Sequence, residues 1–189
     1  MAKDTKTALL DSAERAARTR GFDGFSYADL AQEVGIRKAS IHHHFPTKAA
    51  LSAAIMKRYT QAFAKACQSI DAECATGGAR LAALIDRYRA ALEGGQSLCL
   101  CVSFSTSRNS LPAEVISEIV GFRQMMLAWI AATYHLGGSD RSIAMVHDPA
   151  QEAAATLAML EGAQLRARAE EDPAHFDNAL GLLRSRLAR

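Results

Sequence analysis

The feature that most constrains this chain is its helical periodicity. Apolar residues recur every three to four positions along most of the sequence, which is the spacing of one face of an α-helix. Gly or Pro stands where the periodic segments end, and no segment alternates apolar and polar residues as a half-buried strand does. The pattern therefore predicts an all-α fold of about nine helices. They are expected at about residues 4–20, 27–34, 38–44, 48–74, 79–92, 98–107, 112–135, 149–171 and 173–188.

The charge is unevenly distributed. Residues 1–60 carry ten Lys and Arg against six Asp and Glu, a net +4, whereas residues 61–189 carry twelve against fourteen, a net −2. A basic first third on a slightly acidic remainder is the asymmetry of a chain whose N-terminal part meets a polyanion. A difference of so few charges can also arise by chance, so the charge alone decides nothing.

Other features exclude whole classes of protein. The longest uninterrupted apolar run, Met125–Ala132, is far shorter than the roughly 20 residues of a membrane helix, so no membrane partner is expected. No apolar stretch follows the two lysines of residues 1–6, so no signal peptide is expected. The four cysteines, at 67, 74, 99 and 101, form neither a disulfide framework nor a paired zinc pattern. We expect a soluble, cytoplasmic protein with reduced thiols.

Residues 26–45 carry the most informative pattern. Ser26 is a helix cap with Asp29 as its capping-box partner, and Gly35 supplies a turn between two short helices. Apolar residues give each short helix one inner face, formed by Leu30, Ala31 and Val34 in the first and by Ile36, Ile41 and Phe45 in the second. This is the arrangement of a helix-turn-helix, whose second helix enters the major groove of DNA. The alternative is a plain helical hairpin with a polar outer face.

The outer face of the second short helix has the residue types that bind phosphates and base edges. They are Arg37, Lys38, Ser40, His43 and His44. The three consecutive histidines, His42 to His44, do not predict a metal site, because neighbouring residues on a helix diverge by about 100°. We interpret all three, His42 included, as part of the DNA-facing surface. No motif of a hydrolase, metalloenzyme or nucleotide-binding enzyme is present, so neither catalytic residues nor a cofactor are expected.

This region resembles the TetR-type (TetR/AcrR) transcriptional regulators. The resemblance rests on Asp29-Leu30-Ala31, Val34-Gly35-Ile36, Ser40-Ile41, His43-His44-Phe45, Lys48 and Leu51. It implies a three-helix DNA-binding domain, residues 1–48, joined by a long helix to a ligand-binding and dimerisation domain, residues 49–189. It also implies that Ser40 and His43 contact bases or backbone and that Lys48 meets a phosphate. The chain departs from the family at His42 and His44, where Tyr is frequent, and at Arg37, where Ser or Thr is frequent.

The remaining candidates lie in the C-terminal part. Phe104, Phe122, Met126 and Trp129 are candidate pocket residues for a small apolar or aromatic effector, although such a stripe is more often core. Cys99 and Cys101 stand at the start of the expected sixth helix, where a helix dipole lowers the pKa of a thiol. In some branches of the family a Cys in this region senses electrophiles or oxidants, but both residues can equally be small buried hydrophobes.

The last two expected helices predict a dimer interface, because small residues let helices approach closely. The candidate residues are Ala154, Leu157, Ala158, Gly162, Leu165 and Leu183, with burial inside one protomer as the alternative. The leading hypothesis is a homodimeric repressor that binds a palindromic operator on double-stranded DNA and is released by an effector. The alternatives are a repressor switched by covalent modification of Cys99 or Cys101 and, more remotely, an all-helical enzyme or carrier.

Overall fold

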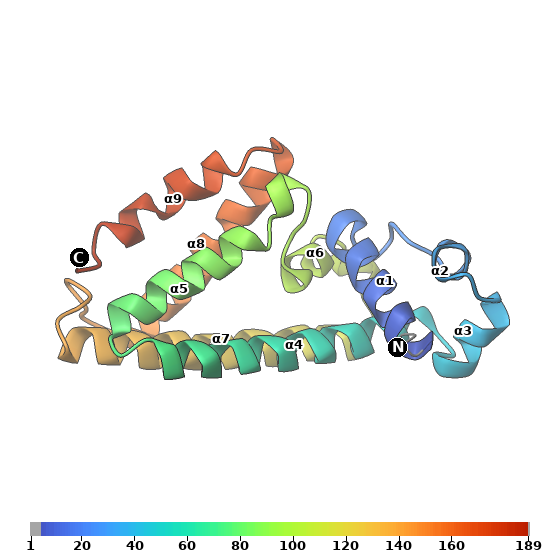
Figure 1. Ribbon diagram of the computed structural model, residues 1–189, viewed down its shortest axis with the longest axis horizontal. Coiled ribbons are helices and arrows are strands. Elements are labelled where there is room, and N and C mark those ends of the chain that lie inside the picture. Colours follow the sequence, from blue (N-terminus) through green and yellow to red (C-terminus); the bar gives the residue numbers. More distant parts are fainter. Residues whose placement is uncertain (1–4, 189) are drawn as a thin grey trace. The chain divides into compact units, whose positions relative to one another are not determined.

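The computed structural model describes residues 5–188, and helices dominate this part of the chain (Figure 1). The nine α-helices and two short 3₁₀ helices found there are α1 Thr5–Arg20, α2 Tyr27–Val34, α3 Lys38–His44, α4 Lys48–Glu73, α5 Gly77–Ala90, η1 Glu93–Gly95, α6 Leu100–Ser105, η2 Arg108–Ser110, α7 Ala113–Ser139, α8 Pro149–Ala169 and α9 Ala174–Arg184. Residues 5–188 contain no strand, and Ile143 and Leu187 form only an isolated antiparallel bridge. The predicted all-α class is therefore confirmed.

Two helix boundaries differ from the prediction in an informative way. The fifth helix, expected to begin at residue 79, begins instead at Gly77, and the Thr76 side chain caps it. Both glycines are buried, and a Cβ atom on Gly77 would lie 2.3 Å from the backbone nitrogen of Gly137 in α7. Two helices therefore cross here too closely for any side chain. The sixth helix also begins later than expected, at Leu100 rather than at residue 98.

The chain divides into two compact units that do not coincide with the expected domains. The first comprises residues up to Gln61 together with Leu100–Gly121, and the second comprises Ala62–Cys99 and Phe122–Arg189. Both boundaries within the long helices fall mid-helix, so α4 and α7 each contribute to both units. The functional division at residue 48 remains a prediction.

The first unit has a core in which α1 packs against α2 and α6. Leu9 and Ala13 of α1 and Leu30 of α2 are completely buried. Phe22 and Phe104 meet edge to face with their ring centroids 6.0 Å apart, and the Ser103 hydroxyl donates a hydrogen bond to the Ala17 carbonyl. These contacts fix α1 as the support for the two short helices that follow it.

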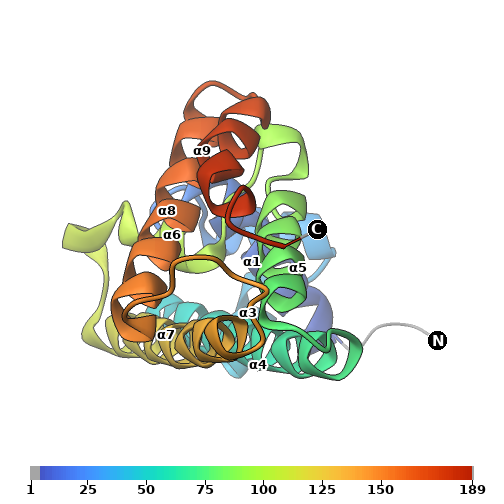
Figure 2. The same ribbon diagram turned by 90° about the vertical axis from the view of Figure 1, so that its left-hand side faces the viewer.

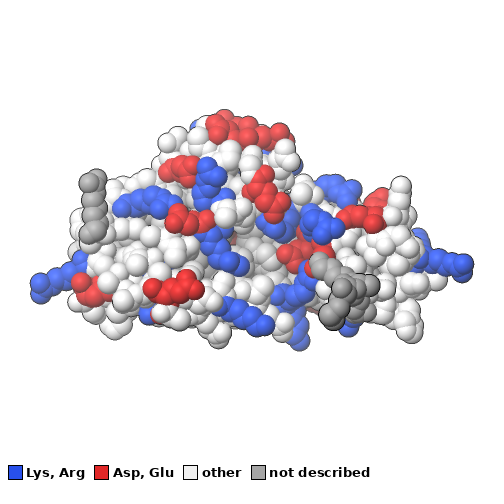
Figure 3. Space-filling model, viewed as in Figure 1, with Lys and Arg blue, Asp and Glu red and all other residues white. Residues whose placement is uncertain are grey.

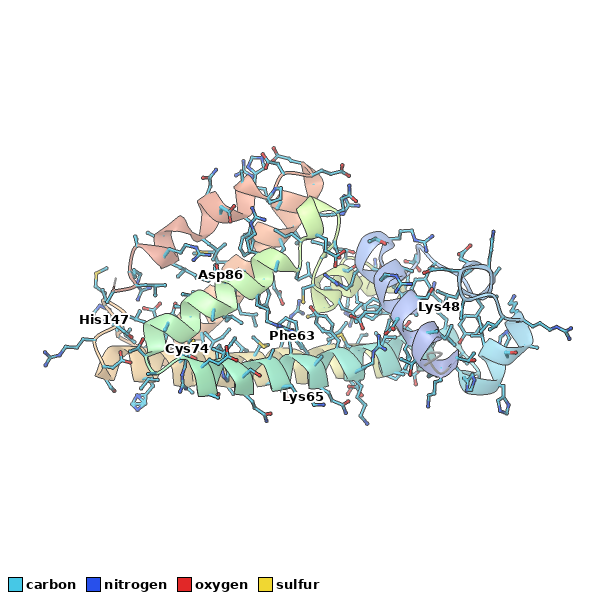
Figure 4. The ribbon with its side chains drawn as sticks, viewed as in Figure 1. Lys48, Phe63, Lys65, Cys74, Asp86 and His147 are labelled. Atoms are coloured by element: carbon cyan, nitrogen blue, oxygen red, sulfur yellow. The ribbon has the colours of Figure 1, made fainter. Side chains whose placement is uncertain are left out.

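The second unit is a bundle in which α8 and α9 lie side by side and pack against α5 (Figure 2). Phe63 lies between α4 and α5 (Figure 4) and meets Tyr88 and Phe122 edge to face. The Trp129 indole donates a hydrogen bond to the Asp71 carboxylate at 3.1 Å, joining α7 to α4. An aromatic cluster thus forms the centre of this unit.

One helix requires a correction to the membrane argument. By length and composition alone α7 could cross a membrane, because an 18-residue window in it has a mean hydropathy of 1.3. The longest uninterrupted apolar run therefore underestimates how apolar α7 is over its whole length. Core helices of soluble proteins pass the same test, and α7 has buried residues at helical spacing, namely Val115, Ile119, Phe122, Met126, Ile130 and Tyr134.

Candidate DNA-binding interface

Local interactions form α2 and the turn after it. The Ser26 hydroxyl accepts the backbone N–H of Asp29, and the Asp29 carboxylate accepts the backbone N–H of Ser26 at 2.7 Å. The predicted capping box is therefore present, and its hydrogen bonds lower the pKa of Asp29. Gly35 ends the helix with φ of 74°, a left-handed conformation that strains residues with a Cβ atom. The turn that separates α2 from α3 is thus encoded by these three residues.

Burial on one side of α3 determines which side chains face outward. Ile41 is fully buried and Phe45 is 6% exposed, which confirms the predicted inner face. The opposite side is solvent-exposed and comprises Arg37, Lys38, Ala39, Ser40, His42 and His43, with His44 half-buried. As expected for an Arg at the N-cap, the Arg37 side chain makes no capping hydrogen bond and is directed elsewhere.

Two surface grooves flank α3. One has a volume of about 530 Å³ and is lined by Thr5, Arg37, Ala39, Ser40, His43 and His44. The other, of about 350 Å³, is lined by Phe25, Ser26, Tyr27, Lys38, His42, Pro46, Thr47 and Lys48. Among these residues there are cations and hydroxyls but no carboxylate. Basic side chains also project from the end of the unit that carries α2 and α3 (Figure 3). The surroundings of α3 therefore favour an anionic partner.

The three histidines of α3 are not equivalent. The His42 ring lies edge-on to Tyr27 with ring centroids 4.9 Å apart, and its Nδ1 lies 3.3 Å from the Pro46 carbonyl. Tyr27 donates its own hydroxyl hydrogen bond to the Phe45 carbonyl, and burial raises the pKa of Tyr27 to about 12. His42 and Tyr27 thus support the C-terminal end of α3 beside the smaller groove, whereas His43 and His44 line the larger groove.

Lys48, at the beginning of α4, is turned toward the protein (Figure 4). Its ammonium donates a hydrogen bond to the Phe25 carbonyl and lies 4.3 Å and 4.7 Å from the ring centroids of Phe25 and Phe22. Burial lowers the pKa of Lys48, and the carboxylates of Asp23 and Asp29 oppose that shift. Its predicted contact with a phosphate therefore remains a prediction, beside a structural role that the sequence did not reveal.

Sequence reasoning missed the supporting residues Phe22, Phe25 and Tyr27. The two phenylalanines lie in a loop, where helical periodicity gives no signal. Two phenylalanines in a loop of only six residues, 21–26, were the available sign that the loop is packed.

The predicted pocket residues are mostly interior. Phe122 and Met126 are fully buried in the second unit, and Phe104 is fully buried in the first. Trp129 is half-buried and hydrogen-bonded to Asp71. These positions agree with a core role, and their contact with an effector remains a prediction.

The predicted sensor thiols are also interior. Cys99 is 1% exposed and Cys101 is fully buried. Cys99 precedes α6 rather than beginning it, and its backbone N–H donates a hydrogen bond to the buried side chain of Gln164. Cys99 thus lies at the N-cap position of α6, and its proposed role as a sensor thiol remains a prediction.

The predicted interface residues divide into two groups. Ala154, Ala158, Gly162 and Leu165 lie exposed on α8. Leu157 and Leu183 are each only 5% exposed, because α8 and α9 of the same chain pack together and bury them. The single chain thus accounts for the burial of these two leucines.

In the part of the chain that the structure describes, no group of three or more His, Cys, Asp or Glu side chains is arranged to hold a metal ion.

Comparison with known proteins agrees with this geometry. Residues 9–55, which include α2 and α3, match the family model described as bacterial regulatory proteins, tetR family. The chain is 24% identical over 190 residues to the HTH-type transcriptional repressor NemR of Escherichia coli, covering 98% of this chain and 94% of NemR. It is 28% identical to the HTH-type transcriptional regulator EthR of Mycolicibacterium smegmatis, covering 90% of this chain and 77% of EthR.

Solved structures show the same fold along the whole chain. A TetR-family transcriptional regulator from Agrobacterium tumefaciens superposes with a TM-score of 0.92 at 26% identity, covering 98% of both chains. The reduced form of E. coli NemR superposes with a TM-score of 0.84 at 23% identity, covering 98% of this chain and 97% of NemR. The helix-turn-helix region thus matches the tetR family model, and the whole chain shares the fold of a TetR-family transcriptional regulator.

Proposed function

We propose that the chain is a cytoplasmic, homodimeric repressor that binds a palindromic operator through α3 and is released by a small apolar or aromatic effector. The observation that supports DNA binding is the exposed side of α3, where Arg37, Ser40 and His43 border one groove and Lys38 borders the other. No carboxylate lines either groove. Arg and Lys there can read guanine or bind phosphate, and Ser and His can donate to either.

The exposed side of α8 supports the proposed dimer. Gly162 leaves open space around its Cα, since a Cβ atom there would meet nothing within 4 Å. Two large apolar side chains of α8 and α9 are exposed, Leu165 at 41% and Leu182 at 67%. Small residues flanked by exposed leucines are suited to close helix packing across a two-fold axis.

A dimer imposes a geometric requirement on DNA binding. Its two recognition helices must lie about 34–36 Å apart to enter successive major grooves. The helix α4 contains residues of both compact units, so a displacement of residues 62–73 is propagated along one continuous helix to Lys48. We infer that an effector releases DNA by changing the spacing of the two recognition helices.

The aromatic cluster of the second unit supports an apolar or aromatic effector. Phe63, Tyr88 and Phe122 meet edge to face, and the Arg87 guanidinium lies 4.8 Å from the Phe63 ring centroid. A planar ligand inserted here finds aromatic surface and one cation, a pairing suited to an aromatic molecule with an electron-rich or anionic group.

A second candidate mechanism keeps the DNA-binding role but replaces the effector with thiol modification. A solved relative, NemR, is described as a reduced form, which names a redox state of that protein. In this chain the mechanism would require the segment around Cys99 and Cys101 to open first, since both residues are buried.

DNA binding is tested by selecting duplexes from a random library with the full-length chain. The proposal expects a sequence with two inverted half-sites centred about one helical turn apart. Ser40→Ala should change the preferred bases, whereas Ser69→Ala, on an exposed part of α4, should not. Recovery of no enriched sequence, or of a single half-site, would contradict the palindromic mode.

The dimer is tested by sedimentation velocity with Gly162→Arg. We expect this variant to remain helical, because Gly162 is open in the single chain, but to sediment as a monomer. Gly121→Arg, at another glycine with open surroundings, is the matched control and should stay dimeric. A dimeric Gly162→Arg variant would place the interface elsewhere.

A further inference from the structure

The side chains that differ most from a fixed-charge DNA-binding surface are the histidines of α3. Histidine is the side chain that gains or loses its charge between about pH 5 and 8. His43 and His44 border the 530 Å³ groove together with Arg37 and Ser40. Within residues 5–188, no hydrogen bond occupies the ring nitrogens of His43 or His44, so both rings are available to a ligand in that groove.

His42 differs from the other two. Its Nδ1 faces the Pro46 carbonyl, which can only accept, so this nitrogen carries a hydrogen when the bond forms. The ring is also held against Tyr27 and lines the other groove, beside Lys38 and Lys48. These contacts with Pro46 and Tyr27 distinguish His42 from His43 and His44.

Among the described residues that line this groove, Arg37 carries a fixed positive charge and none carries a carboxylate. Lys38 lines the other groove, and Lys6 of α1 lies 5.9 Å from the ring centroid of Phe45, the residue after His44. The α1 residue that lines the groove is Thr5, which is uncharged.

The acidic groups of α2 are engaged elsewhere. The Asp29 carboxylate accepts the Ser26 N–H, and the Glu33 carboxylate is paired with Arg15 at 2.6 Å. On the α4 side, Lys48 is directed at Phe25. Phosphates favour protonation of a neighbouring imidazole. Bringing DNA into this groove therefore places negative charge beside both rings.

We propose that operator binding takes up protons through His43 and His44, so that the affinity of the chain for DNA rises as pH falls toward 6. This rests on the proposed function, in which α3 enters the major groove. The two rings lie 5.5 Å apart, so their positive charges repel and the pair gains about one proton per head rather than two. By linkage, DNA affinity changes most steeply with pH where the histidine pair is protonated in the DNA-bound chain but not in the free chain.

The test measures the Kd of full-length chain for a fluorescent duplex, selected by the chain itself, from about pH 6 to about pH 7.5 at constant salt. Uptake of about one proton per head raises Kd at least tenfold across this range. His43→Gln/His44→Gln should abolish most of this change. The matched control His135→Gln, an exposed histidine on α7, should retain it.

A measurement on the unmodified chain covers the case in which the double variant does not fold. Binding enthalpies in two buffers with different ionisation enthalpies give the number of protons taken up, and a positive number near about pH 6.5 is expected. A pH-independent Kd, an unchanged slope in the folded double variant, or zero proton uptake overturns the proposal while leaving DNA binding intact. Failure to bind any duplex at any pH overturns the proposed function as well.

Discussion

The ammonium of Lys48 donates a hydrogen bond to the carbonyl of Phe25 and lies over the ring of the same residue. One lysine at the beginning of α4 thereby anchors the loop between α1 and α2, 23 residues earlier in the chain. The position that the family resemblance assigns to a phosphate contact therefore also stabilises the DNA-binding unit.

We predict that Lys48→Met lowers the free energy of unfolding by about 1–3 kcal/mol, because the Phe25 carbonyl loses a donor and two rings lose a cation. Lys65→Met, at an exposed lysine on the same helix, should change it little. Urea denaturation followed by circular dichroism measures both. Equal stability of the two variants would show that the Phe25 contact contributes nothing.

The same variant separates the two roles of Lys48. If its ammonium also reaches a phosphate, Lys48→Met should reduce the slope of log affinity against log salt by about one. A weaker affinity with an unchanged slope would assign Lys48 to positioning alone.

The helix-turn-helix was predictable because its determinants are local. Ser26, Asp29 and Gly35 each act within a few residues, and the burial of Ile41 and Phe45 follows from helical spacing. The contact of Lys48 was not predictable, since its partner lies in a loop whose conformation depends on the packing of the whole unit.

The start of α5 was likewise not predictable from the local sequence. A Gly-Gly pair commonly ends a helix, and the sequence offered no sign that Gly77 would instead pack against Gly137, 60 residues later. The place of Cys99 before α6 is fixed by a buried hydrogen bond from its backbone N–H to the Gln164 side chain, 65 residues later in the chain. Long-range packing decided both positions.

The second prediction concerns the ion pair between Glu152 and Arg186, in which both side chains are less than one-fifth exposed. The hydrogen bonds from Arg186 lower the pKa of Glu152 in the folded chain. As pH falls below about 5, Glu152 is therefore protonated in the unfolded chain before it is protonated in the folded chain. The stabilisation by this ion pair is lost as pH falls further.

Glu152→Gln should lower stability at neutral pH by about 1–3 kcal/mol and reduce the dependence of stability on acid pH. Glu114→Gln, at an exposed carboxylate on α7, is the control, because exposed charges contribute little. Chemical denaturation at neutral pH and at about pH 4 gives the comparison. Parallel pH profiles for Glu152→Gln and the original chain would exclude the pair as a source of acid sensitivity.

The third prediction orders the four cysteines by reactivity. Cys74 is half-buried, whereas the other three are buried, and burial raises the pKa of Cys67 to about 11, with the Asp71 carboxylate adding to the shift. In the native protein a maleimide should therefore modify Cys74 first, as resolved by peptide mass spectrometry. Labelling of Cys99 as fast as Cys74 would indicate that the segment before α6 opens readily, and would favour the thiol-switch mechanism over effector release.

The last prediction concerns the coupling between effector and DNA. Trp129 is the only tryptophan of the chain, and its indole N–H is hydrogen-bonded to Asp71 within the second unit, so its fluorescence should respond when a ligand perturbs that unit. A ligand shifts an equilibrium only by its different affinities for the two states, and the coupling is reciprocal. An aromatic compound that weakens DNA binding by a given factor should therefore bind the DNA-loaded chain more weakly by the same factor. Titrating a panel of small aromatic compounds with and without the selected duplex measures this, with calorimetry as a check independent of Trp129. A compound that releases DNA yet binds both forms equally would rule out the allosteric mechanism, because its binding could not favour the released state.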